Sequence, residues 1–312
     1  MSSWRSSKIL VTGTIDEIGR TLVHNWRERG YEQVVTYTAP NVNLRDKRVV
    51  NTFFERELPD VVVVLSPKVS AAPRRSLSRA LWLRHNLLTA TNVIHAAYLY
   101  DVEKLLYIDC GLTCFDSFTF HGQSGAWAAS EDARRLADVA GSAAAALCDS
   151  YRSQYGCSFT SAFIGNLYGP GVNFAPEDRH VVATLLREVA RGKRVGSPSV
   201  EVRGRADWTC DLLHVEDFVD VCTTLLQDEA RAGTVSVEPA RRYSVSEVAA
   251  EVRRAVGYDG EILFDDVGPP DLAPMTSPLA SRLDWTPRIT LPDGLSSTLQ
   301  WFLRQTALSE LN

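Results

Sequence analysis

The chain has 312 residues, a length that fits one large α/β domain or two smaller ones. Hydrophobic residues make up 45% and charged residues 23% of it, the ordinary composition of a globular protein. The formal net charge of -5 leaves no basic excess to neutralise phosphates, which argues against nucleic acid and anionic membranes as partners.

Strands and helices alternate along the first half of the chain. Short runs of aliphatic residues predict strands over 8–11, 34–37, 61–65, 104–108 and 159–163, and helical spacing predicts helices over 18–29, 47–57, 79–100 and 132–155. The run Val61–Leu65 is aliphatic throughout, which is typical of a strand buried on both faces. This alternation predicts an α/β fold with a Rossmann-type, doubly wound parallel sheet.

The alternation loosens after Gly169 and Pro170. The expected elements there are a helix over 179–191, a strand over 212–215, and helices over 216–228, 244–255 and 292–305. We therefore expect a Rossmann-like domain over residues 1–170, to which 212–230 return. Residues 171–312 are expected to form a smaller C-terminal α/β substrate-binding lobe.

Six scattered cysteines include no CxxC pair, which predicts reduced thiols, and we expect no metal site. No apolar signal core precedes the first strand, and the longest apolar run is far too short to span a bilayer. These features predict a cytoplasmic protein with no membrane partner.

Several stretches resemble the extended short-chain dehydrogenase/reductase superfamily, and especially its GDP-L-fucose synthases, when they are taken together and in order. They include "HNLLTATNVIHAAYLYDVEKLLYI", "GNLYGPGVNF", "LLHVEDF" and "LDWTPRITLPDGL". The resemblance implies NADP as cofactor, a nucleotide sugar as substrate, and combined epimerase and reductase activity. It also implies a homodimer or heterodimer formed through the two long helices, here 79–100 and 132–155.

The turn after the first strand departs from the TGxxGxxG pattern of this superfamily. Gly13 and Gly19 remain, but Asp16 stands where a glycine lets the backbone approach a pyrophosphate. With Glu17 it places two negative charges at a helix N-terminus that would otherwise attract phosphate. Asp46 matches a family acid near the adenine, although a solvated turn acid explains it equally well. We therefore predict that the NADP site has been lost and that no cofactor is used.

The catalytic tyrosine and lysine of the superfamily lie four residues apart on one helix. The resemblance places them at Ala137 and Gly141, neither of which can transfer a proton. The literal YxxxK of Tyr100 and Lys104 precedes the strand that should come before this helix, and we interpret it as a chance match. Orthodox hydride chemistry is therefore not expected.

The fucose synthase resemblance also implies an acid–base pair that epimerises carbons beside a keto group. Without a gap the superfamily's catalytic serine falls on Gly111, and with a two-residue insertion it falls on Thr113, next to Cys114. The preserved motif "NFAPEDRHVV" supplies His180. The candidate catalytic residues are therefore Thr113, Cys114 and His180. The alternatives are a small core residue for Cys114 and a structural hydrogen bond for His180.

Three residues are candidates for binding a sugar nucleotide: Asn166, Arg187 and Arg203. Most cations with which the family holds the phosphates are replaced here; Cys210 and Glu188 stand at two arginine positions. Arg187 and Arg203 are candidates for a new anion site, with ordinary surface arginines as the alternative. Asn166 lies in a loop that also has a structural use as a turn.

The sequence leaves two main hypotheses for function. The first is a non-redox enzyme of the epimerase, isomerase or lyase type that acts on a sugar nucleotide or another small metabolite. The second is a non-catalytic pseudoenzyme that stabilises a partner subunit, for which the small residues "AGSAAAALC" on the second long helix offer a close-packing face. An intact NADP-dependent epimerase/reductase is the least favoured hypothesis.

Overall fold

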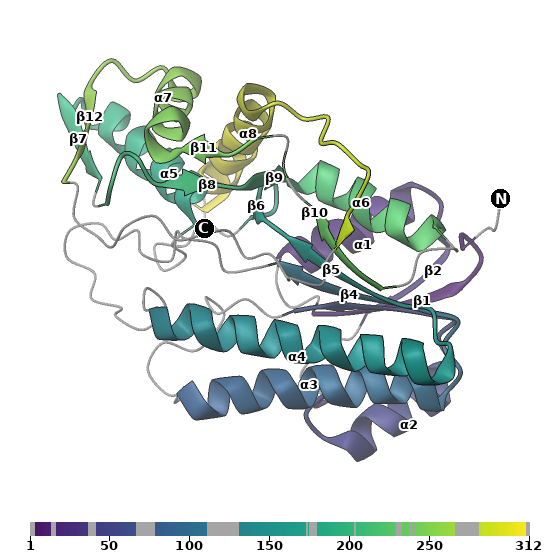
Figure 1. Ribbon diagram of the computed structural model, residues 1–312. Helices are drawn as coiled ribbons and strands as arrows, with labels where there is room; N and C mark the ends of the chain where they lie inside the picture. The colour runs from purple at the N-terminus through teal and green to yellow at the C-terminus, as the bar shows by residue number, and fades with distance from the viewer. Residues whose placement is uncertain are drawn as a thin grey trace.

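The computed structural model describes residues 4–13, 17–36, 42–66, 79–110, 131–172, 174, 180–202, 204–228, 233–237, 239, 241–265 and 281–309. A seven-stranded parallel sheet forms its centre, in the order β13-β10-β5-β4-β3-β1-β2 (Figure 1). Its strands are β1 (Lys8–Thr12), β2 (Gln33–Thr36), β3 (Val61–Leu65), β4 (Lys104–Cys110), β5 (Phe159–Ile164), β10 (Gly233–Val237) and β13 (Ser281–Arg282). The predicted α/β, Rossmann-type fold class is confirmed.

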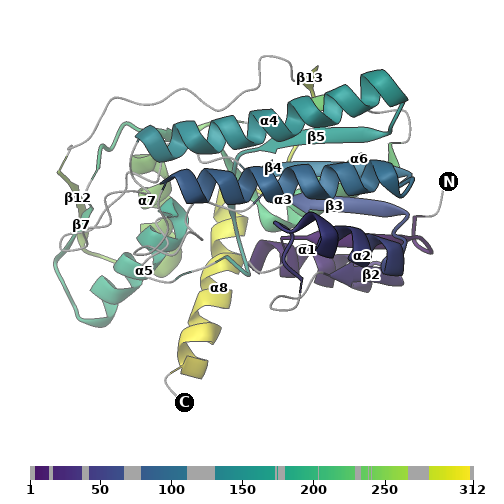
Figure 2. The ribbon, with the colours of Figure 1, turned by 90° about the horizontal axis from the view of Figure 1, so that it is seen from below.

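Helices cover both faces of this sheet. One face carries α1 (Glu17–Glu28) and α6 (Val215–Gln227), and the other carries α2 (Lys47–Glu57), α3 (Arg79–Leu99) and α4 (Glu131–Tyr155). Figure 2 shows α3 and α4 side by side on the face of the sheet that they cover. The strands are apolar on both sides because alternate residues enter different cores.

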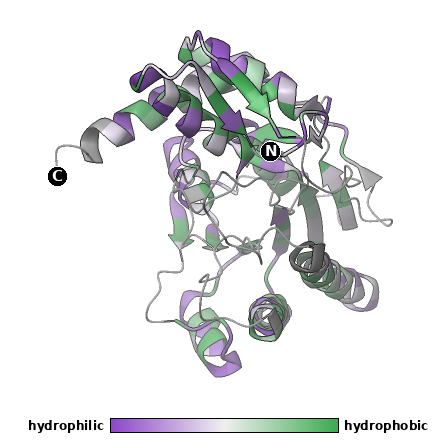
Figure 3. Ribbon diagram, turned by 90° about the vertical axis from the view of Figure 1, so that its left-hand side faces the viewer, coloured by the Kyte–Doolittle hydropathy of each residue, from purple (hydrophilic) through white to green (hydrophobic). Residues whose placement is uncertain are grey.

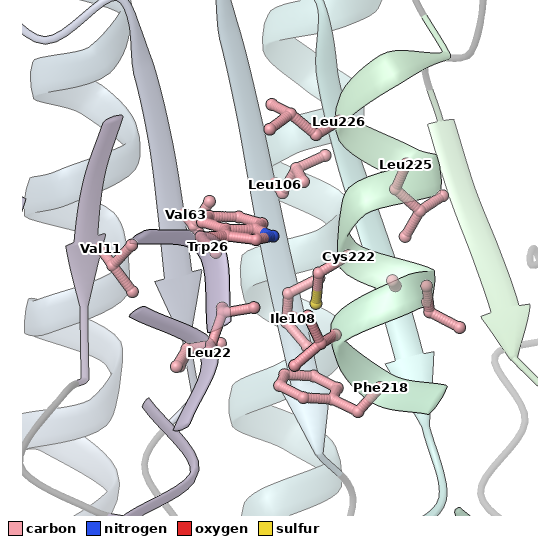
Figure 4. Packing of buried hydrophobic residues seen from close by; sticks show 14 of the residues in the cluster. Val11, Leu22, Trp26, Val63, Leu106, Ile108, Phe218, Cys222, Leu225 and Leu226 are labelled. Carbon is pink, nitrogen blue, oxygen red and sulfur yellow. The ribbon is translucent and has the colours of Figure 1, made fainter. Parts of the chain in front are cut away.

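The two cores explain the all-aliphatic strands. Val11, Val63 and Ile108 pack with Trp26 of α1 and Phe218 of α6 (Figure 4), whereas their strand neighbours enter the core beneath α2, α3 and α4. Strands β10 and β13 were not among the predicted elements. The edge strand β13 has only two residues, and β10 has the sequence GTVSV, in which polar residues interrupt the apolar run.

A second, smaller group of elements packs around its own core beside the carboxyl ends of β4 and β5 (Figure 1). It contains the helices α5 (Val181–Arg194), α7 (Val245–Val256) and α8 (Leu291–Ser309), with the short strands β6 (Asn166–Tyr168), β7 (Ser199–Val202), β8 (Thr209–Cys210), β9 (Leu212–His214), β11 (Tyr243–Ser244) and β12 (Glu261–Phe264). The capping box predicted at Ser244 and Glu247 opens α7. The role of this lobe in substrate binding stays a prediction.

Hydrophilic and hydrophobic residues alternate along the helices (Figure 3). No helix within the described ranges is long and apolar enough to cross a membrane.

Candidate functional site

The turn that leaves β1 is built around Gly13. Its φ of 82° lies in the left-handed region, and a Cβ there would come within 2.6 Å of the backbone oxygen of Leu65. Only glycine therefore lets the ends of β1 and β3 approach this closely at the carboxyl edge. Gly19 is buried in the first turn of α1, and its role in cofactor binding stays a prediction. Asp16 lies outside the described residues.

Asp46 has a local structural role. It is the N-cap of α2, and its carboxylate accepts a hydrogen bond of 2.9 Å from the backbone N–H of Arg48. This contact supports the alternative of a turn acid, and a role in cofactor binding stays a prediction. Next to it, the guanidinium of Arg45 lies 3.2 Å from the ring of His85 on α3. Burial, then Arg45 and Arg84, lowers the pKa of His85.

The resemblance places the family's tyrosine and lysine at Ala137 and Gly141, and both of these residues lie on α4. At Gly141 the backbone packs directly against the side chain of Asp109, the penultimate residue of β4. A Cβ at position 141 would overlap Oδ2 of Asp109 and lie 3.0 Å from its Cγ. A carboxylate therefore occupies the space that the first atoms of a lysine side chain would need.

Asp109 is 6% exposed, and its side chain lies against Gly141 of α4. Burial, the charge of Asp138 and, in the opposite direction, a side-chain hydrogen bond with Ser66 set its pKa at about 7, well above the ordinary 3.8. Sequence analysis did not single out Asp109. The signal was present, because this acid is the only charged residue after Lys104 in the otherwise apolar strand "KLLYIDC".

Of the three candidate catalytic residues, only His180 lies in the described part of the chain. It is the N-cap residue of α5, half-buried, and its side chain does not cap the helix. Thr113 and Cys114 fall outside the described residues, so the acid–base pair of Cys114 and His180 stays a prediction.

The candidate substrate-binding residues are spread over the smaller lobe. Asn166 begins β6, which pairs with β9. On α5, the Arg187 guanidinium donates to the Glu188 carboxylate at 3.2 Å and to the backbone oxygen of Phe174 at 3.3 Å. These contacts within the lobe supply a structural explanation for Arg187. Arg203 lies outside the described residues.

Lys104, from the chance YxxxK match of Tyr100 and Lys104, lies at the amino edge of the sheet, opposite the carboxyl edge where Gly13 lies. Lys104 begins β4, is 1% exposed, and its ammonium donates to the backbone oxygen of Asp228 at 2.5 Å. Because parallel strands bring their carboxyl ends to one edge, this lysine cannot share a site with Gly13.

Known proteins resemble this chain over nearly its whole length. Residues 9–237 match the family described as NAD dependent epimerase/dehydratase. GDP-L-fucose synthase 1 of Arabidopsis thaliana is 32% identical over 305 residues, which cover 96% of this chain and 94% of that protein. The Escherichia coli GDP-L-fucose synthase is 29% identical, covering 95% and 96%. A GDP-mannoheptose C4 reductase from Campylobacter jejuni, solved with NADP bound, superposes with a TM-score of 0.75 at 25% identity, covering 96% and 99%.

These similarities overturn the prediction that the NADP site has been lost. That prediction rested on the repulsion expected from Asp16 and Glu17. It is wrong, since structures similar to this chain over 96% of its length hold NADP. The physical reason is that backbone groups of the β1–α1 turn contribute most to holding a pyrophosphate, and the tight turn at Gly13 is kept.

Proposed function

Because the chain belongs to the NAD-dependent epimerase/dehydratase family, we propose that it binds NADP(H) and a nucleotide sugar and catalyses a redox-neutral proton transfer on that sugar. The reaction class is epimerisation or isomerisation. The turn at Gly13 is the observation that carries the cofactor part of the proposal. A Cβ at position 13 would lie 2.6 Å from the backbone oxygen of Leu65, so only glycine fits there.

The described residues fit the dinucleotide at its adenosine and pyrophosphate end. Gly13 leads toward the N-terminus of α1, where the helix dipole favours a phosphate. Leu44 is buried with Leu10 and Val64, and the guanidinium of the neighbouring Arg45 donates to the side-chain oxygen of Asn43 at 2.7 Å. We assign Arg45 as a cation for the adenosine phosphate, a role that sequence analysis did not foresee.

At the nicotinamide end of the dinucleotide, the residues differ from those that hydride transfer needs in this superfamily. When bound, NADP(H) supplies hydride transfer, which in this superfamily depends on the tyrosine and lysine. Ala137 and Gly141 carry no proton donor, and the buried Asp109 carboxyl lies where the lysine chain would start. These residues favour a reaction that moves protons on the sugar and leaves its oxidation state unchanged.

Binding is tested by calorimetric titration with NADPH and NADH, followed by a GDP-linked 4-keto sugar. Gly13→Ala should lose NADPH affinity because its Cβ meets Leu65. Gly30→Ala is the matched control: Gly30 also has a positive φ, of 85°, but no atom lies within 4 Å of its Cβ position. Equal loss in both variants would show that backbone strain, and not the site, was measured.

Catalysis is tested by incubating the protein and the keto sugar in D2O. Deuterium entering the sugar carbons beside the carbonyl, without consumption of NADPH, supports the proposal. Sugar reduction coupled to NADPH oxidation would contradict it and would indicate an intact reductase.

A second function, a non-catalytic or stabilising subunit, is favoured by one observation. Apolar side chains remain exposed on the paired helices, namely Leu81 and Leu99 of α3, and Val139 and Tyr155 of α4, each more than 40% accessible. Burial of such residues against a second α3–α4 pair would form a homodimer or heterodimer. The sequence-based expectation of a cytoplasmic location remains a prediction.

A further inference from the structure

The guanidinium of Arg45 faces a histidine and not an acid. Its Nε donates to the side-chain oxygen of Asn43 at 2.7 Å, and its Nη1 lies 3.2 and 3.3 Å from the two ring nitrogens of His85 on α3. The carboxylate of the adjacent Asp46 accepts from the backbone N–H of Arg48 in its own helix. Within the described residues Arg45 therefore has no carboxylate partner, and its charge is open to an anion.

The direction of α2 places Arg45 at the carboxyl edge of the sheet. The last residue of α2, Glu57, pairs at 3.0 Å with Lys8, which begins β1 at the amino edge. The 11 residues of α2 rise by about 16 Å, which is also about the length of the five-residue strand β1. The N-terminus of α2, just after Arg45, therefore lies at the edge where the strands end.

Helix α3 brings His85 to the same edge. Asn92 of α3 donates to the backbone oxygen of Leu44 at 3.0 Å, which holds the turn before α2 against α3. His85 precedes Asn92 by two helical turns, so the two lie on one face of α3. Because α3 ends five residues before β4 begins, its C-terminus is at the amino edge. His85 is therefore nearer the carboxyl edge than Asn92 is.

This position matches one end of a bound dinucleotide. A dinucleotide that binds at the turn of Gly13 directs its adenosine ribose past the end of β2, the strand beside β1. An acid in that region binds the 2′-hydroxyl of NAD, whereas an arginine accommodates the 2′-phosphate of NADP. Here the side chain of Asp46 caps α2, and Arg45 is the cation without a carboxylate partner.

We propose that Arg45 and His85 together bind the 2′-phosphate of NADP(H), and that His85 takes up a proton from solvent as the phosphate binds. This inference rests on the proposed function, because it names how the same site selects its dinucleotide. Arg45 supplies the permanent charge, and His85 supplies a second donor only when the phosphate is present. No bond of the dinucleotide is broken.

The proton uptake follows from the charges around His85. Burial, and then the charges of Arg45 and Arg84, lowers the pKa of His85, so that its ring is neutral near pH 7. Among the described residues, these two arginines are the charged groups that act on the ring. A phosphate dianion beside Arg45 offsets both positive charges and favours the protonated imidazole, which donates a charge-assisted hydrogen bond to it.

Selection of the dinucleotide is tested by calorimetry with NADPH and NADH at pH 7. The wild type should bind NADPH at least about tenfold more tightly than NADH, and Arg45→Gln should remove this preference without changing NADH affinity. Arg56→Gln is the matched control, because Arg56 lies at the other end of α2 and pairs with Glu57.

The outcomes separate this inference from the function on which it rests. Equal affinities in the wild type, or a preference that survives in Arg45→Gln, would overturn the inference and leave the proposed dinucleotide site standing. A wild type that binds neither dinucleotide would refute the proposed function, and this inference with it.

Proton uptake is tested by proton NMR of the His85 ring, assigned by its loss in His85→Gln. NADPH should move the His85 titration to higher pH, whereas NADH should leave it in place. The affinity for NADPH should also fall between pH 7 and pH 8.5, where the phosphate keeps its full charge, and His85→Gln should abolish this fall. A His85 titration that NADPH does not move would overturn the role of His85.

Discussion

Replacing Asp109 with asparagine changes how the stability of the protein depends on pH. In the folded protein the pKa of Asp109 is about 7, compared with an ordinary value of 3.8, because the carboxyl is buried and Asp138 adds a like charge. Between these two values the folded chain binds a proton that the unfolded chain has released. The free energy of unfolding therefore falls as the pH rises through this window, and it is unaffected by Asp109 at lower pH.

The magnitude follows from the size of the shift. About three pKa units, at 1.36 kcal/mol each, correspond to about 4 kcal/mol over the whole window, and coupling to Asp138 makes this an upper value. Asparagine has nearly the same shape, accepts the hydrogen bond that involves Ser66 and carries no charge. We expect Asp109→Asn to match the wild type near pH 4 and to exceed its stability by roughly 2–4 kcal/mol at pH 8.

The assay is urea unfolding at pH 5, 6, 7 and 8, followed by tryptophan fluorescence. The difference between the wild type and the variant cancels the contribution of groups that titrate in both. Asp149→Asn serves as the control for loss of a carboxylate elsewhere in the protein, since the Asp149 carboxylate accepts hydrogen bonds from Arg152 and Thr234. If Asp109→Asn and the wild type lose the same free energy of unfolding between pH 5 and pH 8, Asp109 does not carry a proton in the folded protein at neutral pH.

Three further substitutions test other contacts. Asp46→Ala should lower stability by about 1 kcal/mol through the lost N-cap while leaving NADPH affinity unchanged in calorimetry. A loss of affinity would show that Asp46 contributes to cofactor binding. Gly141→Ala should destabilise the protein because its Cβ overlaps Asp109, and adding Asp109→Gly should restore the melting temperature; no rescue would contradict the close contact. Val139→Glu should shift a dimer toward monomer in sedimentation experiments, and an unchanged mass would exclude this face of α4 as the interface.

The fold could be predicted from sequence because its signals are local. The run Val61–Leu65 identifies a strand buried on both faces without reference to the rest of the chain. The alternation of strands and helices then leaves few topologies, since crossovers in parallel sheets are right-handed. Strands β10 and β13 escaped prediction because their positions depend on pairing with β5 and with each other, a property of the assembled sheet.

The site could be predicted only in part. Gly13 follows from a local pattern, and its strained turn is where that pattern places it. The contact between Asp109 and Gly141 joins residues 32 positions apart. Neither this contact nor the raised pKa of Asp109 can be predicted from either segment alone. The predicted loss of the NADP site was wrong because two side-chain charges were weighed without the backbone groups of the turn.

Calorimetric titration of the protein with NADPH, alongside Gly13→Ala and Gly30→Ala, tests the central claim most directly. We expect saturable binding at micromolar NADPH to the wild type and to Gly30→Ala, and a loss of at least tenfold in affinity, about 1.4 kcal/mol, in Gly13→Ala. No binding to the wild type at millimolar NADPH would contradict the claim that this chain uses the dinucleotide site of its family.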